Sequence, residues 1–155
     1  MNSTNAKRGM AMLFIAVLGT TSLCYAGPSG DNGSIGEVKR EARDFIHALK
    51  AYSADQRDEA LRKAKAALDD LDQRIDVLER RIDDNWDKMD KAARRHARDS
   101  MDALRKRRTQ VAEWYGSLKN SSVDAWGHMK KGLSDAYRSL YDAWEKSEKE
   151  FGSDK

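Results

Sequence analysis

The sequence is poor in cysteine, which forms the disulfides of many small domains and the thiol groups of many reactive centres. Among 155 residues there is one cysteine, Cys24, and one proline, Pro28. A single cysteine excludes an internal disulfide framework and a CxxC motif for metal or redox chemistry. Between Glu37 and Tyr115 there is neither glycine nor proline. A stretch of that kind, rich in Ala, Leu, Lys, Arg, Asp and Glu, predicts helix.

Long apolar runs are also missing. The longest, Met10–Leu18, has about half of the roughly 20 residues that a membrane-spanning helix needs. Lys7 and Arg8 precede it, and the small-x-small site Cys24-Tyr25-Ala26 follows it. This pattern predicts a signal peptide over residues 1–26 that is cleaved after Ala26, and hence an exported, periplasmic protein.

A strong charge of one sign is absent from the mature chain. The full sequence holds 29 Lys and Arg against 26 Asp and Glu. Cleavage removes Lys7 and Arg8, which leaves 27 against 26 and a net charge of +1. Proteins dedicated to nucleic acids normally carry a clearly basic domain, so we expect no nucleic-acid partner.

The mature chain divides by composition into three parts. Residues 27–36 (GPSGDNGSIG) form a predicted flexible leader, residues 37–151 a helical coiled-coil domain, and residues 152–155 a tail. Ser34 with Glu37 is a capping-box pattern that predicts a helix start near Ile35, and Ser53 with Gln56 marks a second candidate break. Turn-forming residues gather at 116–122, so the last helix is expected from Val123.

The apolar residues of the domain recur at helical spacing. Residues spaced alternately by three and four, typical of a coiled-coil seam, include Leu61, Leu68, Leu71, Ile75, Leu78 and Ile82. The last helix repeats the pattern at Trp126, Leu133, Leu140 and Trp144, which we interpret as core rather than as a binding stripe. The predicted fold is all-α, with long amphipathic helices in an antiparallel coiled-coil hairpin or three-helix bundle.

The partner of the Leu61–Ile82 seam is left open by the sequence. Residues 69–90 hold nine acids and four bases, and residues 91–108 hold eight bases and two acids. An antiparallel arrangement centred near Asp90 sets these two blocks against each other. A turn near Asp84-Asn85 would do so within the chain. An unbroken helix would do so in an antiparallel dimer, which the lack of glycine there slightly favours.

A basic tract is the second candidate site. Its members are Arg94, Arg95, Arg98, Arg105, Lys106, Arg107 and Arg108. The favoured interpretation is that they complement the acidic block. The alternative is contact with an anionic lipid surface, with Trp114 and Tyr115 as interfacial anchors.

Motifs for chemistry are scarce. His47, His96 and His128 have no second histidine one turn away, and the sequence contains no HExxH, GxSxG or glycine-rich phosphate loop. We therefore expect no catalytic residues, no metal site and no cofactor.

The C-terminal part carries a recurring pair of alanine and an aromatic residue, at Ala125-Trp126, Ala136-Tyr137 and Ala143-Trp144. With this pattern, the last two-thirds of the chain resembles small bacterial all-helical coiled-coil proteins labelled stress-response or uncharacterised. The resemblance implies an all-helical fold and a stress-related role, and it transfers no catalytic residue. We expect a periplasmic scaffold, adaptor or holdase that binds proteins through amphipathic helix faces. The alternative is a peripheral lipid-binding helical protein.

Overall fold

The structure is a computed structural model that describes residues 34–152. The predicted signal peptide at 1–26, the leader up to residue 33 and residues 153–155 of the tail lie outside this range. None of the described helices is long and apolar enough to cross a membrane.

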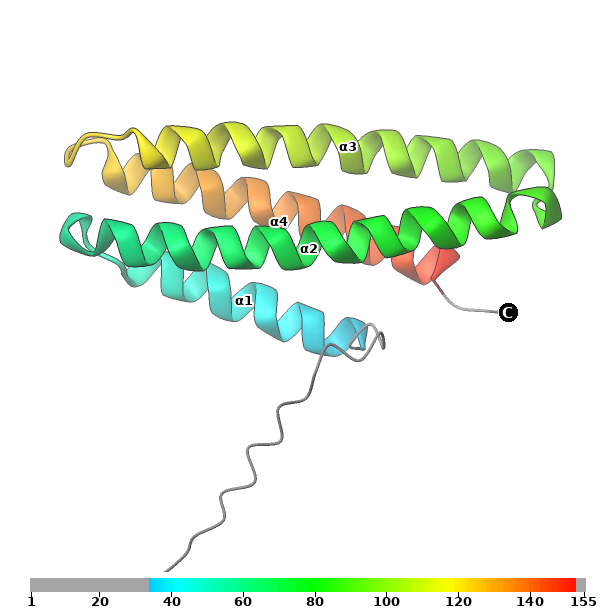
Figure 1. Ribbon diagram of the computed structural model, residues 1–155, viewed down its shortest axis with the longest axis horizontal. Helices are drawn as coiled ribbons and strands as arrows, with labels where there is room; N and C mark the ends of the chain where they lie inside the picture. The colour runs from blue at the N-terminus through cyan, green and yellow to red at the C-terminus, as the bar shows by residue number, and fades with distance from the viewer. Residues whose placement is uncertain (1–33, 153–155) are drawn as a thin grey trace, which may run out of the picture. The chain divides into compact units, whose positions relative to one another are not determined.

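Four helices make up the described part of the chain (Figure 1). They are α1 (Ile35–Ala51), α2 (Arg57–Asn85), α3 (Lys91–Lys119) and α4 (Trp126–Phe151), with 3-10 turns at Ala54–Gln56 and Trp86–Lys88. Successive helices run in opposite directions, and α1 and α3 each pack against both α2 and α4. The prediction of an all-α antiparallel bundle is confirmed, with four helices where the sequence suggested two or three.

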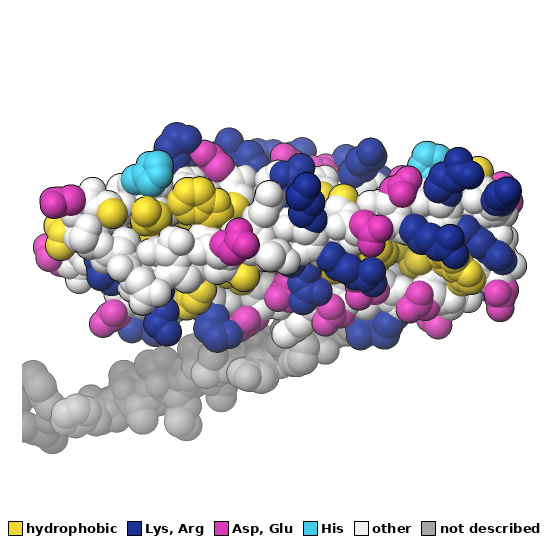
Figure 2. Space-filling model, turned by 90° about the horizontal axis from the view of Figure 1, so that it is seen from above, with side chains coloured by type: hydrophobic (Ala, Val, Ile, Leu, Met, Phe, Trp, Pro, Cys, Tyr) yellow, Lys and Arg dark blue, Asp and Glu magenta, His cyan; other side chains and the backbone are white. Residues whose placement is uncertain are grey.

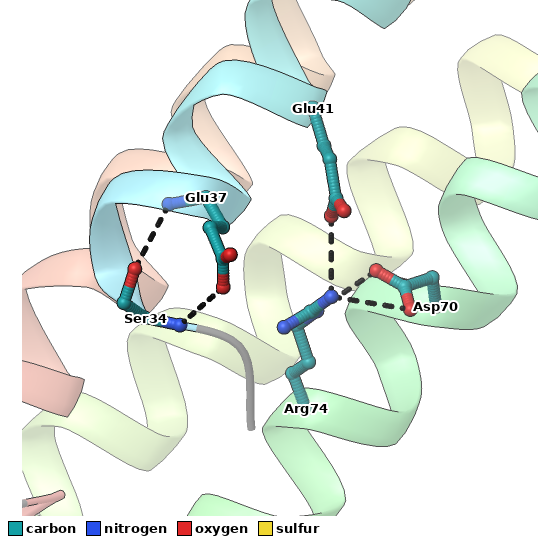
Figure 3. A network of polar contacts seen from close by, with 5 residues as sticks. All are labelled: Ser34, Glu37, Glu41, Asp70 and Arg74. Carbon is teal, nitrogen blue, oxygen red and sulfur yellow. Dashed lines mark hydrogen bonds and ion pairs between the residues drawn. The ribbon is translucent and has the colours of Figure 1, made fainter. Parts of the chain in front are cut away.

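The first helix begins where the sequence predicts. The Ser34 hydroxyl accepts a hydrogen bond from the Glu37 amide at 3.3 Å, and the Glu37 carboxylate accepts one from the Ser34 amide at 3.0 Å (Figure 3). Each bond satisfies a backbone donor that the first turn of a helix leaves free. The N-terminus of α1 is therefore fixed by local chemistry.

The predicted break at Ser53 is also present, and side chains of α4 bind the backbone carbonyls at the end of α1. The Trp126 indole donates to the Tyr52 carbonyl at 3.1 Å, and the Lys130 ammonium donates to the Lys50 carbonyl at 2.8 Å. Lys50 lies in the last turn of α1 and Tyr52 is its C-cap, where backbone carbonyls lack donors within the helix. The start of α4 thus caps the end of α1, and α1 becomes a separate short helix.

The preference for an unbroken helix through Asp84-Asn85 is wrong. The helix α2 ends at Asn85, and α3 begins at Lys91 with Asp90 as its N-cap, whose carboxylate accepts from the Ala93 amide at 2.8 Å. The turn needs no glycine because Asn85, Met89 and Asp90 all keep negative φ, at −98°, −79° and −71°. Any L-residue adopts these angles, so the missing glycine carried no information.

The last turn falls slightly later than predicted. The helix α4 begins at Trp126 and not at Val123, and the Ser122 hydroxyl accepts from the Ala125 amide at 3.2 Å. Further along, Gly132 faces Trp114 of α3, and a Cβ at this position would overlap the indole ring. That glycine therefore allows α3 and α4 to approach closely.

Candidate functional site

The predicted Leu61–Ile82 seam lies inside the single chain. Leu71, Ile75, Leu78 and Ile82 are buried, whereas Leu61 and Leu68 are half-buried and pack on the edge of the same core. The other three helices cover the seam because the turn after Asn85 brings α3 back along α2. The seam is part of the core of the bundle, and the motive for a dimer through it is removed. Self-association itself stays a prediction.

The acidic and basic blocks meet across the α2–α3 pair. The Arg108 guanidinium lies 2.8 Å from the Asp72 carboxylate and 3.5 Å from that of Asp76. Arg105 lies 3.4 Å from Glu79. The favoured interpretation of the basic tract as the counterpart of the acidic block holds for these two arginines, within one chain.

Three further members of the tract, Arg94, Arg95 and Arg98, line a second open pocket of about 430 Å³ together with Lys91 and Asp99. Arg94 donates to the Trp86 carbonyl at 2.9 Å, and the Arg98 guanidinium lies 5.0 Å from the centre of the Trp86 ring. Arg95, Lys106 and Arg107 are exposed on α3 and form no ion pair within residues 34–152. On the face shown in Figure 2, acidic and basic side chains are interspersed.

The two proposed interfacial anchors are half-buried in the bundle. The Trp114 ring lies over Gly132 and meets the His128 ring edge-on at a centroid distance of 6.0 Å. Tyr115 packs against the core. Side chains held in this way do not stand out toward a headgroup layer as interfacial aromatic residues do.

A cleft that the sequence analysis did not identify lies between α1 and α4. It has an open volume of about 270 Å³. It is lined from α1 by Lys39, Ala42, Arg43, Ile46, His47 and Lys50, and from α4 by Arg138, Tyr141 and Asp142. Four permanent cations and one carboxylate therefore line the cleft, and two further acids, Glu145 beside Lys39 and Asp135 near Lys50 and Arg138, lie just outside the lining.

The floor of the cleft is apolar. Ala42 and Ile46 are buried, and the Tyr141 side chain is also buried beside them. Burial raises the pKa of the Tyr141 phenol above its ordinary value of 10, so at neutral pH the ring carries a neutral hydroxyl. An apolar floor below cationic rims suits an anionic ligand that also presents an apolar edge.

An ion pair lies beside the cleft at Lys39. The Glu145 carboxylate of α4 lies 2.7 Å from Lys149 and 3.6 Å from Lys39 of α1. The hydrogen bond from Lys149, helped by the charge of Lys39, lowers the pKa of Glu145 below its ordinary value of 4.5. This carboxylate therefore ties α1 to α4 beside the cleft.

We expect the contribution of Glu145 to stability to depend on pH. Because its pKa is lower in the folded state, it stabilises the fold fully above about pH 4.5, and the effect is lost as the pH falls through the lowered pKa. Glu145→Gln should therefore reduce the free energy of unfolding by about 0.2–1 kcal/mol at pH 7 and leave it unchanged at pH 2. Urea unfolding at both pH values measures this.

Glu113→Gln is the matched control for that experiment. Glu113 is exposed and has no ion pair in the described part of the chain, so its replacement should change stability at neither pH. A loss for Glu145→Gln that persists at pH 2 would show that packing, and not ionisation, is responsible.

Metal-ligating side chains do not gather in groups of three or more within residues 34–152. In the cleft, His47 stands beside cations, which repel a metal ion. The chemistry that the cleft supports is electrostatic and apolar binding.

The sequence contained part of the signal for this cleft. Lys39, Arg43, His47 and Lys50 recur at intervals of four, four and three residues, so they share one face of α1. Arg138 and Tyr141 lie about 90 residues further on, and only the antiparallel packing of α4 on α1 brings them alongside. Comparison with known proteins adds no relative, because no family model, curated protein or solved structure matches the chain.

Proposed function

We propose that the mature protein is an exported helical interaction protein, an adaptor or scaffold of the cell envelope, which holds an anionic partner in the cleft between α1 and α4. The observation that carries this proposal is the excess of four cations over one carboxylate around an apolar floor. Exposed side chains without a binding role usually pair with the opposite charge, as Lys65 does with Asp69 on α2. A local excess of one sign favours association with the opposite charge.

The closed core favours an adaptor over a holdase. A holdase needs a sizeable exposed apolar surface, and within residues 34–152 Val123 is the one large hydrophobic residue that is exposed. Binding through the Leu61–Ile82 seam would require the bundle to open. The cleft is accessible without any such change.

Affinity capture from envelope extracts tests the proposal, with the chain from Gly27 onward as bait. The cleft variant Arg43→Glu with Arg138→Glu reverses two exposed cations that form no ion pair among the described residues. The control variant Lys63→Glu with Lys106→Glu makes the same charge change on exposed positions of α2 and α3. A partner should be retained by the unchanged bait and by the control, and lost by the cleft variant.

Two results would contradict the proposal. If the cleft variant and the unchanged bait capture the same proteins equally, binding does not use the cleft. If cell fractionation recovers the chain unprocessed and outside the envelope, the predicted export is wrong. Circular dichroism of each bait shows whether the variants keep their helix content.

A further inference from the structure

The cations of the cleft are spread along its length. On α1 they are Lys39, Arg43 and Lys50, and His47 occupies the turn between the last two. A helix rises 1.5 Å per residue, so the eleven steps from Lys39 to Lys50 span about 16 Å. Arg138 faces them from α4. The cleft is thus a groove whose positive charges are distributed along its length and are not gathered at one end.

This distribution discriminates between classes of occupant. An anionic lipid has its charge at one end and an apolar tail at the other, so it would match cations clustered at one end of a groove. A uniformly charged polymer would match the cations, but it would leave the apolar floor of Ala42, Ile46 and Tyr141 without a counterpart. A helix with acids on one stripe and apolar residues on the next matches both features.

We propose that the groove docks an acidic amphipathic helix of a partner protein, about three turns long, which lies alongside α1. The inference rests on the proposed function and names its partner. Acidic side chains spaced by three or four residues would face Arg43, Lys50 and Arg138. The adjacent apolar stripe would lie against the floor at Ala42 and Ile46, which are only 3% and 7% exposed, so the charged contacts carry most of the binding. Lys39 contributes less because it already lies 3.6 Å from Glu145.

The residues that would carry the contact are available for it. Arg43, Lys50 and Arg138 are exposed, and none forms an ion pair within the described residues. Lys50 is held in place through its backbone, because its carbonyl accepts from Lys130 of α4. A partner can therefore bind these cations without breaking a bond that holds the bundle together.

Binding of a synthetic peptide tests the inference. The probe is a fluorescent helical peptide with glutamate and leucine repeating at helical spacing on adjacent stripes, and its control is a scrambled peptide of the same composition. Fluorescence anisotropy should show binding of the probe to the mature protein and to the variant Lys63→Glu with Lys106→Glu. Binding should fall by about tenfold or more for Arg43→Glu with Arg138→Glu, since two attractive pairs become repulsive.

Three further measurements complete the test. Lys50→Glu alone should also weaken binding, which guards against a folding defect in the double variant. Raised salt should weaken binding to the unchanged protein, because exposed charges are screened. Vesicles of phosphatidylglycerol should not co-sediment with the protein.

The failures are distinguishable. Equal binding of the probe to all variants, or equal binding of the scrambled peptide, overturns the helix-docking inference. Co-sedimentation with vesicles that depends on Arg43 and Arg138 identifies an anionic lipid as the occupant instead. If the peptide does not bind but envelope capture still depends on the cleft, the partner is of another kind and the proposed function stands. If neither depends on the cleft, both proposals fail.

Discussion

Replacing Trp144 with alanine is expected to lower the free energy of unfolding by about 3–5 kcal/mol, the range found for large aromatic residues in cores. The Trp144 side chain is 1% exposed, and Ala97 of α3 is fully buried in the same core. The Tyr141 ring lies 6.0 Å away, centroid to centroid. Removing the indole would leave a cavity that rigid neighbouring helices fill poorly. Domains of this size are stable by about 5–15 kcal/mol in total, so the variant would be close to unfolding.

Urea unfolding followed by circular dichroism measures this effect, and Trp86→Ala is its matched control. Trp86 is half-buried at the α2–α3 turn, where Arg94 and Arg98 lie over its ring. Its removal should cost clearly less, because part of its surface is already in contact with water. Unchanged unfolding of Trp144→Ala, together with loss of partner capture, would show that the aromatic face of α4 is a binding surface and not core.

The helix ends that the sequence predicted are those set by local bonds. Ser34 with Glu37 and Ser53 with Gln56 each lie three residues apart, so the atoms that define the break are visible in the sequence. The turn after Asn85 was not predicted, although the bond from the Ala93 amide to Asp90 that begins α3 is equally local. Its side chains bond nearby backbone, and Arg94 reaches back eight residues to the Trp86 carbonyl. A turn in which every φ is negative does not require glycine. The sequence of this segment is therefore equally compatible with a continuous helix.

The same distinction applies to the cleft and the seam. The basic stripe of α1 follows from helical spacing, but charge on an exposed helix face is common and does not indicate a groove. The groove exists because α4 lies beside α1, clamped at Trp126 and Lys130. The sequence correctly predicted that the seam is apolar and buried. It did not show which surface covers the seam, because residues buried within a chain and residues buried between chains follow the same apolar pattern.

An arginine of α2 holds α1 over part of the Leu61–Ile82 seam. The Arg74 guanidinium of α2 lies 2.8 Å from Asp70 on its own helix and 3.2 Å from Glu41 of α1 (Figure 3). Arg74 thus forms one ion pair within α2 and a second ion pair between α2 and α1. It lies one residue before Ile75 of the seam, which is fully buried. The short helix α1 covers one part of the seam, and α3 and α4 cover the rest.

The second large effect is expected for Leu78→Glu. Leu78 is fully buried in α2, within the core that all four helices share. A carboxylate at this position would be buried without a partner, a cost of several kcal/mol, and the leucine contacts would be lost as well. We expect a largely unfolded chain with little helix signal. Gln73→Glu is the control, because it places the same charge on the exposed face of the same helix and should leave unfolding nearly unchanged.

The concentration dependence of unfolding separates closure within one chain from closure between two. If the seam is satisfied inside the chain, the midpoint of thermal unfolding of the unchanged mature protein should not vary with protein concentration, because no association is coupled to folding. Sedimentation would then give a monomer, and Leu78→Glu would unfold it. A midpoint that rises with concentration, together with a Leu78→Glu variant that is a folded monomer, would instead place Leu78 at an interface between copies. The turn at Asn85 would then have to open in solution and allow α2 and α3 to join into the continuous helix that an antiparallel dimer requires.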